Sequence, residues 1–271
     1  MRLSTKCLSS AKWLKLTASA ACLSAGVLMT QAASATTVLI ETSLGNIEVN
    51  LFDKTTPKTV ENFLTYVKAN AYTDSFIHRS APGFVLQAGG YKYTTKIEAI
   101  PQNAKVVNEP VYSNVRGTIA MAKVGNDANS ATNQWFINLS NENVPNLDKQ
   151  NGGFTVFGQI SASHMEIVDQ ITKLNRFNMG SPLDSIPLRN YTATDNTNKV
   201  PVTNDHFVLI KSITVLNADP DTAVGLNPAK NTLINEKDDD KGGGGGGSTG
   251  LFGLMMLGLL ALGRKSLLNR K

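Results

Sequence analysis

Two helical patterns, separated by more than 90 residues of short strand patterns, constrain the fold most strongly. Thr56 and Pro57 predict the start of the first helix, because Thr suits a cap and Pro suits the first helical position. Apolar residues at helical spacing follow, namely Val60, Phe63, Leu64 and Val67. The second helix is predicted from Ser163, with Glu166 completing a capping box. Its inward-facing residues are Met165, Val168 and Ile171.

The other patterns are short and strand-like. Alternating apolar residues on each side of Gly45-Asn46 predict a hairpin over 38–51. Further strands are expected near 76–79, 84–88, 117–123, 134–140, 154–160 and 206–216. Such an order does not build repeated strand–helix–strand units, so we expect a mainly β domain, a closed antiparallel barrel with a helix at each end. Residues 175–205 read as a polar loop.

Residues 1–35 have the pattern of a secretory signal peptide. Four basic residues precede an apolar run over 16–29, and Ala33-Ser34-Ala35 supplies small residues for cleavage. The alternatives are a membrane anchor, for which the apolar run is short of roughly 20 residues, and a lipoprotein signal at Cys22. We expect cleavage after Ala35 and an exported domain over 36–217.

The C-terminal end carries a second targeting pattern. A disordered, charged and glycine-rich linker is expected over 218–247, including the unbroken run Gly242–Gly247, and a short apolar helix with a basic tail over 248–271. This arrangement resembles the GlyGly-CTERM sorting signals of Gram-negative bacteria, which implies cleavage near the glycines and transfer toward the cell surface. A plain membrane anchor is the alternative.

The targeting segments explain the basic composition. The chain has 26 Lys and Arg against 21 Asp and Glu, but eight of the basic residues lie in 1–35 and after Gly263. The remaining 18 basic residues give the middle of the chain a net charge of about −3, which does not support nucleic-acid binding. Both cysteines, Cys7 and Cys22, precede residue 36. The predicted mature chain therefore has no thiol nucleophile, and its scattered His residues do not favour a metal site.

The segment Phe76–Gly90, FIHRSAPGFVLQAGG, places a cation, an aromatic ring and a neutral amide within nine residues, as Arg79, Phe84 and Gln87. This set is poorly suited to breaking a covalent bond and well suited to gripping a peptide and polarising one amide. Asp74, Ser75 and His78 include the residue types of a hydrolase triad. As near neighbours on one strand, however, they would point to different faces.

The chain resembles the cyclophilins, the peptidyl-prolyl cis-trans isomerases, over about residues 36–217. The resemblance rests on FIHR-x4-FVLQ-x-GG at 76–90, GTIAMA at 117–122, QWFIN at 134–138, NLD at 146–148 and FTVFG at 154–158, in that order. It is greatest to the short-loop bacterial periplasmic members. It implies a closed eight-stranded antiparallel barrel capped by two α-helices, with the site on the outer face.

The resemblance also implies roles for individual residues. Arg79 matches the catalytic arginine, and Gln87 matches the glutamine that bonds the substrate backbone. The residues that match the substrate-binding groove are Phe84, Val85, Ala122, Lys123, Phe136, Leu147 and Phe154. Trp135 should pack inward beside Phe136, and the Lys123 side chain would favour acidic residues near the proline. No cofactor and no metal are implied.

The implied partners are proline-containing segments of exported proteins, in the periplasm or envelope of a Gram-negative bacterium. The tail adds a membrane contact, nucleic acid is not expected, and we expect a monomer. Asn146 stands where many cyclophilins have Trp, which implies weak cyclosporin binding. Two other functions stay open: a non-catalytic module that holds proline peptides, and a surface scaffold.

Overall fold

The predicted N-terminal hairpin is formed by β1 (Thr37–Thr42) and β2 (Gly45–Leu51). In this computed structural model, which describes residues 36–218 and 226–236, Ile40 pairs with Ile47. The predicted signal peptide and C-terminal tail lie outside the described residues. Every second residue of both strands is buried, as the alternation predicts for a sheet with one face on the core.

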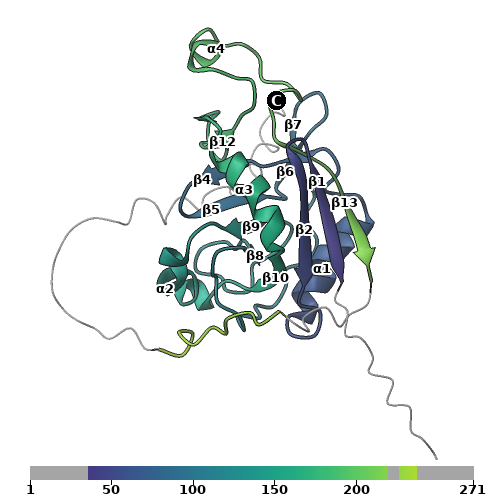
Figure 1. Cartoon of the computed structure of the whole chain (residues 1–271), viewed down its shortest axis with the longest axis vertical. Helices are drawn as coiled ribbons and strands as arrows, with labels where there is room; N and C mark the ends of the chain where they lie inside the picture. Colours follow the sequence, from purple (N-terminus) through teal and green to yellow (C-terminus); the bar gives the residue numbers. More distant parts are fainter. Residues whose placement is uncertain (1–35, 219–225, 237–271) are drawn as a thin grey trace, which may run out of the picture. The chain divides into compact units, whose positions relative to one another are not determined.

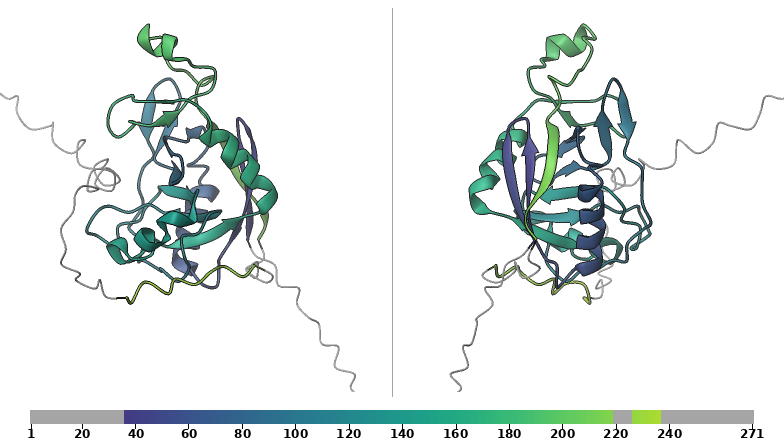
Figure 2. Two further views of the ribbon diagram at one scale, coloured as in Figure 1. Left: turned by 60° about the vertical axis from the view of Figure 1, so that its left-hand side comes forward. Right: turned by 90° about the vertical axis from the view of Figure 1, so that its right-hand side faces the viewer.

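Eleven strands form one antiparallel sheet in the order β4-β5-β9-β8-β10-β2-β1-β13-β3-β6-β7 (Figure 1). The remaining nine are β3 (Ser75–Phe76), β4 (Arg79–Ala81), β5 (Val85–Ala88), β6 (Tyr91–Tyr93), β7 (Ile97–Ala99), β8 (Thr118–Met121), β9 (Trp135–Asn138), β10 (Val156–Ile160) and β13 (Leu209–Asn217). The sheet curls strongly (Figure 2), but among the described residues its end strands β4 and β7 are not paired with each other. The mainly β class is confirmed, whereas the closed eight-stranded barrel is not.

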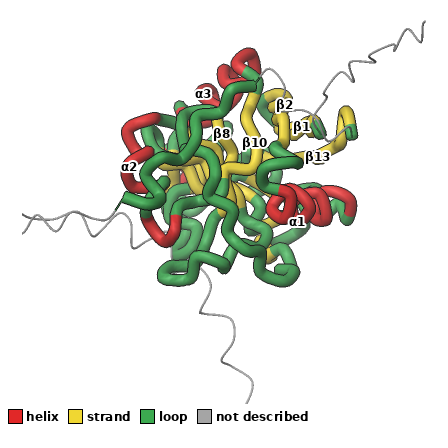
Figure 3. Tube along the Cα trace, turned by 90° about the horizontal axis from the view of Figure 1, so that it is seen from below, coloured by secondary structure: helices red, strands yellow, loops and turns green. Residues whose placement is uncertain are grey.

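Two longer helices pack on this sheet, α1 (Pro57–Lys68) and α3 (Met165–Thr172), and two short ones are α2 (Val144–Leu147) and α4 (Ala193–Thr197). Figure 3 shows α1 and α3 on different sides of the strands. Both contribute to the main hydrophobic core, α1 through Val60 and Phe63 and α3 through Val168 and Ile171. The predicted apolar stripes therefore face the interior.

α1 begins at Pro57 as the sequence predicts, but its capping and the start of α3 differ from the prediction. Thr56 is the residue before α1, but its hydroxyl donates to the Phe52 carbonyl and caps nothing. The Glu109 carboxylate instead accepts from the backbone N–H of Thr59 at 2.9 Å, supplying negative charge at the helix N-terminus. The capping box predicted from Ser163 is wrong, because a 3-10 turn over 162–164 comes first and α3 begins at Met165.

A second apolar cluster lies apart from the main core. Its buried members are Phe52, Val85, Tyr112, Ala120, Phe136, Leu147, Phe154 and Val156, and Phe84, Ala122 and Leu226 pack against it. We call this set the second cluster. It contains most of the apolar residues predicted to line the groove.

Residues 175–205, predicted as a polar loop, contain ordered elements. They include the pair β11 (Arg176–Phe177) and β12 (Ile186–Pro187), together with α4. Their apolar side chains join Phe76 and Phe207, which stack with ring centroids 4.4 Å apart, in a third cluster. β12 runs beside β4, where the Ser80 backbone N–H donates to the Ser185 carbonyl at 2.8 Å.

Residues 226–236 lie within the predicted linker, yet they contact the domain. The Ser113 backbone N–H donates to the Ala229 carbonyl at 2.8 Å, and the Asn231 N–H to the Val111 carbonyl at 2.9 Å. The expectation of a structureless linker is therefore wrong for this stretch. Within the described ranges, no helix has the length and apolar character needed to cross a bilayer.

Candidate active site

Strand register places three predicted site residues in one row. Arg79 on β4 pairs with Gln87 on β5, and Gln87 pairs with Phe136 on β9. Directly opposed residues of an antiparallel pair project from the same face, with Cβ atoms about 4.5–5.5 Å apart. The side chains of Arg79, Gln87 and Phe136 are therefore neighbours on one face of the sheet.

Strand alternation separates this face from the main core. Val85 belongs to the second cluster, whereas its neighbours Leu86 and Ala88 belong to the main core. On β9, Phe136 belongs to the second cluster and Trp135 to the main core. Trp135 thus packs inward, as the sequence predicts, and Phe136 lies on the face that carries Arg79.

Arg79 combines burial with an unused donor. Its Nη1 atom is buried and makes no hydrogen bond to any described residue. Burial lowers the pKa of the guanidinium, and the nearby Asp184 carboxylate opposes that effect. Arg79 Cζ lies 5.8 Å from the centroid of the Phe84 ring, within the range of a cation–π contact. The arrangement keeps a cation in a partly dehydrated place with hydrogen-bonding capacity left over.

The Gln87 side chain is held by Gln134, which directly precedes β9, whereas Arg79 lies on β4. Its Nε2 donates to Oε1 of Gln134 at 2.9 Å, and this is the side-chain bond that the structure gives it. Gln134 in turn bonds His78, whose pKa is lowered to about 3 by burial first and by the Arg79 charge second. Gly90 makes room for this chain, because a Cβ there would lie 2.9 Å from Gln134 Cδ. His78 is therefore neutral and structural.

Gln134 belongs to the QWFIN motif at 134–138, but the sequence alone predicts no role for it. The signal was present in the strand period, since Gln134 precedes Phe136 by two residues. Residues two positions apart along an extended strand share a face, and Gln134 directly precedes β9. Gln134 is the partner that orients the Gln87 amide.

The apolar part of the site comes from three separate segments. Phe136 and Phe154 meet edge to face with ring centroids 5.6 Å apart, and the Phe154 N–H donates to the Leu147 carbonyl at 2.9 Å. Phe84 and Ala122 are partly exposed at the border of the same cluster. The predicted groove residues are thus brought together, apart from the Lys123 side chain.

The Lys123 side chain is buried instead of exposed at the predicted groove. It is 5% exposed, and its ammonium donates to the carbonyls of Asn151 at 2.8 Å and Gly153 at 2.6 Å. It also lies 4.8 Å from the Phe154 ring centroid. A buried ammonium bound to carbonyls does not select acidic residues in a substrate. The expectation that this side chain favours acidic residues in the substrate is therefore wrong. Lys123 instead contacts the Phe154 ring and the turn before it.

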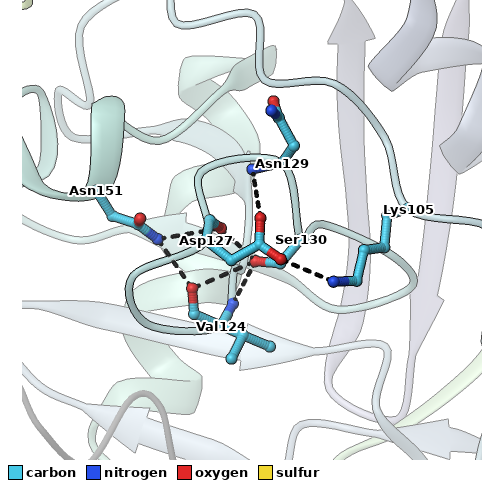
Figure 4. Close-up of polar contacts among 6 residues, drawn as sticks. All are labelled: Lys105, Val124, Asp127, Asn129, Ser130 and Asn151. Carbon is cyan, nitrogen blue, oxygen red and sulfur yellow. Dashed lines mark hydrogen bonds and ion pairs between the residues drawn. The ribbon is translucent and has the colours of Figure 1, made fainter.

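The loop beside Lys123 is tied to the same turn. The Asn151 amide donates to the Val124 carbonyl at 2.9 Å, and the Ser130 hydroxyl donates to the Asp127 carbonyl at 2.6 Å (Figure 4). Lys105 Nζ lies 2.7 Å from the Asp127 carboxylate. These contacts hold residues 124–130 against the turn that precedes Phe154. No group of three or more His, Cys, Asp or Glu residues in the described ranges could hold a metal ion.

Comparison with known proteins agrees with this geometry. The family model described as "Cyclophilin type peptidyl-prolyl cis-trans isomerase/CLD" matches residues 37–193. A peptidyl-prolyl cis-trans isomerase of Acinetobacter baylyi is 34% identical over 178 residues, covering 65% of this chain and 87% of the relative. Peptidyl-prolyl cis-trans isomerase A of Dickeya dadantii is 36% identical over 156 residues, covering 58% and 80%.

A solved cyclophilin-type isomerase of Cryptosporidium parvum is 22% identical, with a TM-score of 0.47, over 67% of this chain and 98% of that one. The family match spans more than half of the chain and includes the row of Arg79, Gln87 and Phe136. The chain belongs to the cyclophilin-type peptidyl-prolyl cis-trans isomerases, and it is an enzyme that accelerates rotation about the bond preceding proline.

Proposed function

We propose that the peptide binds on the face formed by Arg79, Gln87 and Phe136. The proline ring would enter beside Phe84 and Ala122, the partly exposed residues at the border of the second cluster. It would then meet the side chains of Phe136, Leu147 and Phe154, which are at most 1% exposed in this structure. The observation that carries the proposal is the half-buried Arg79 guanidinium, whose buried Nη1 atom is a free donor beside an apolar cluster. Cation, amide and aromatic ring follow one another across three paired strands. A peptide lying along this row would meet each of them in turn.

The chemistry of the prolyl bond explains why this set suffices. Amide resonance creates a rotation barrier of roughly 18–20 kcal/mol. In the twisted transition state the lone pair returns to the prolyl nitrogen, where a guanidinium donor can stabilise it. Such an interaction is stronger in the transition state than in the planar ground state, so it lowers the barrier. A partly dehydrated position strengthens it further.

The other residues restrict the substrate. The apolar rings would hold the pyrrolidine while the rest of the peptide turns about it. Gln87, oriented by Gln134 at 2.9 Å, would bond the substrate backbone and fix its direction. No bond is made or broken, so the site needs no nucleophile and no general acid.

A variant of Arg79 tests the assignment. Arg79→Ala should lose about 10²–10³-fold of the catalytic rate, the usual cost of removing one preorganised donor. A protease-coupled assay on an Ala-Pro peptide measures it. The matched control is Arg176→Ala, which removes an exposed arginine outside the groove and should keep the full rate. An Arg79→Ala enzyme that is as fast as the control would refute the mechanism.

We further propose that the enzyme assists the folding of exported proteins as a monomer in the Gram-negative periplasm or envelope. The leader pattern over 1–35 and the absence of cysteine after residue 35 support export. The tail over 248–271 supports a membrane contact before or instead of cleavage near the glycines. Envelope fractionation tests the location, and the mass of the mature C-terminus tests the cleavage; an intact Lys271 would contradict it.

We also propose that cyclosporin inhibits this enzyme weakly. Asn146 is exposed on α2, next to the buried Leu147, at the position where many cyclophilins carry Trp. Asn146→Trp should bind cyclosporin more tightly because a large apolar surface is added at the groove border. Its isomerase rate should stay within about twofold of the parent, as expected for a surface substitution. Equal inhibition of the two proteins would rule out this explanation.

A further inference from the structure

Residues 226–236 form a segment that lies beyond the family match and packs against the domain. We call it the C-terminal strap. It bridges residues 111–113 in an antiparallel manner through the pair Tyr112 and Lys230. In Figure 1 the strap is yellow-green and runs below α2, the helix that ends at Leu147. The strap therefore adjoins the segment that supplies one wall of the groove.

Asn231 is the buried polar centre of the strap. Its side chain is 9% exposed in the folded chain, and its Nδ2 donates to the Asp148 carbonyl at 2.9 Å. Its Oδ1 accepts from the backbone N–H groups of Leu233 and Ile234, both at 3.0 Å. One amide thus fixes the turn of the strap and joins it to the residue after Leu147.

Asp148 carries this connection onward. Its carboxylate accepts from the Ser113 hydroxyl at 2.6 Å and from the Asn114 N–H at 2.8 Å. The Asn114 amide also donates to the Phe154 carbonyl at 3.1 Å. A continuous hydrogen-bonded network therefore links the strap to the backbone of Asp148, which follows Leu147, and to the backbone of Phe154.

Apolar contacts join the strap to the same part of the domain. Leu226 packs against the second cluster, which contains Leu147 and Phe154. Ile234 Cδ1 lies 3.1 Å from the position that a Cβ on Gly153 would take, directly before Phe154. Gly153 itself has φ +69. The strap thus closes over the irregular turn that links the two wall residues.

We propose that the C-terminal strap completes the peptide groove, with Asn231 as a positioning residue for the wall formed by Leu147 and Phe154. The turn between these residues has left-handed backbone at Asn151, Gly152 and Gly153, so little regular structure holds it. Buried polar groups that lose a partner are costly, which makes the network an effective anchor. The proposal rests on the groove assigned above.

Full-length Asn231→Ala, compared with Asn235→Ala, tests this role. Asn235 is an exposed Asn of the same strap. We expect Asn231→Ala to raise KM for an Ala-Pro peptide about three- to tenfold, the loss that one buried hydrogen bond implies. Its kcat should change less than twofold, because Arg79 on β4 is outside the network. The NMR methyl signals of Leu147 should shift in Asn231→Ala and stay in place in Asn235→Ala.

Three results separate the possible failures. A KM equal to that of Asn235→Ala, or a fall in kcat and thermal stability at unchanged KM, would overturn the strap proposal. If Asn231→Ala does not fold, Ile234→Ala must show the same rise in KM at unchanged kcat, and its failure to do so overturns the proposal equally. An Arg79→Ala enzyme with full rate would instead remove the groove assignment, whatever the strap variants do.

Discussion

Lys123 is an ionisable residue whose position creates a measurable pH dependence. Burial lowers its pKa from 10.5 to about 8, and the Asp127 charge, itself paired with Lys105, partly opposes this effect. Between these two values the unfolded chain binds a proton that the folded chain has released. The contribution of Lys123 to the free energy of unfolding must therefore rise with pH between about 8 and 10.5. Below pH 8 this contribution does not change with pH.

Lys123→Met removes this titration. The stability of the parent relative to Lys123→Met should increase by on the order of 1–3 kcal/mol between pH 8 and pH 10, at 1.36 kcal/mol per pKa unit. Urea unfolding of both proteins at several pH values measures it. Lys123→Arg serves as the control, because its guanidinium stays charged throughout. If the free energies of unfolding of the parent and of Lys123→Met change with pH in the same way, the burial of the ammonium has no such effect.

The chemical types at the site could be predicted from the sequence, but some side-chain directions could not. The family resemblance assigned Arg79, Gln87 and Phe136 to the site, and the pairing of β4, β5 and β9 places them in one row. The direction of Lys123 depends on carbonyls 28 and 30 residues further on. No local pattern carries that information, so the sequence prediction placed its charge in the groove.

At the scale of elements, the end of β5 depends on a glycine that another residue could replace only with backbone strain and a steric clash. Gly89 has φ +82, and a Cβ there would lie 2.4 Å from the Asn133 carbonyl oxygen and 2.9 Å from Trp135 Cδ1. Gly83 also has a positive φ, +73, but a Cβ there would meet nothing within 4 Å. A comparison of substitutions at the two glycines therefore separates the cost of backbone strain from the cost of a steric clash.

Gly83→Ala should cost only the left-handed backbone penalty of about 1–2 kcal/mol. Gly89→Ala should cost that amount and about 1–3 kcal/mol more, because the core around Trp135 must shift. Denaturant unfolding of both variants gives the difference. Equal losses of stability would mean that the strand and its neighbours move apart without strain.

The positions of α1 and of the N-terminal hairpin followed from periodicity, whereas β6, β7, the short helices and the helix capping did not. The apolar stripe of α1 faces the core as its spacing predicts. Its N-terminus, however, is satisfied by Glu109, which is 50 residues away from Thr59. A tertiary contact thus replaced the local cap that Thr56 could have made. The same limit applies to Asn231, whose partner Asp148 is 83 residues away.

At the scale of the molecule, the mainly β class was predictable, but the order of strands in the sheet, its closure and the strap were not. Closure of the sheet would require its two end strands, β4 and β7, to pair with each other. The alternation of apolar residues within a strand carries no information about that pairing. The strap has the polar composition of a linker, and it is ordered by a few buried contacts rather than by an apolar pattern. Composition alone therefore assigned it to a disordered segment.

The half-buried Arg79 guanidinium is the group that we expect to accelerate rotation of a bound prolyl bond. Exchange spectroscopy on an Ala-Pro peptide at saturating concentration separates rotation on the enzyme from binding. For Arg79→Ala we predict peptide affinity within about threefold of the parent and on-enzyme exchange at least about 100-fold slower. On-enzyme exchange at the parent rate, with the peptide still bound, would contradict the account.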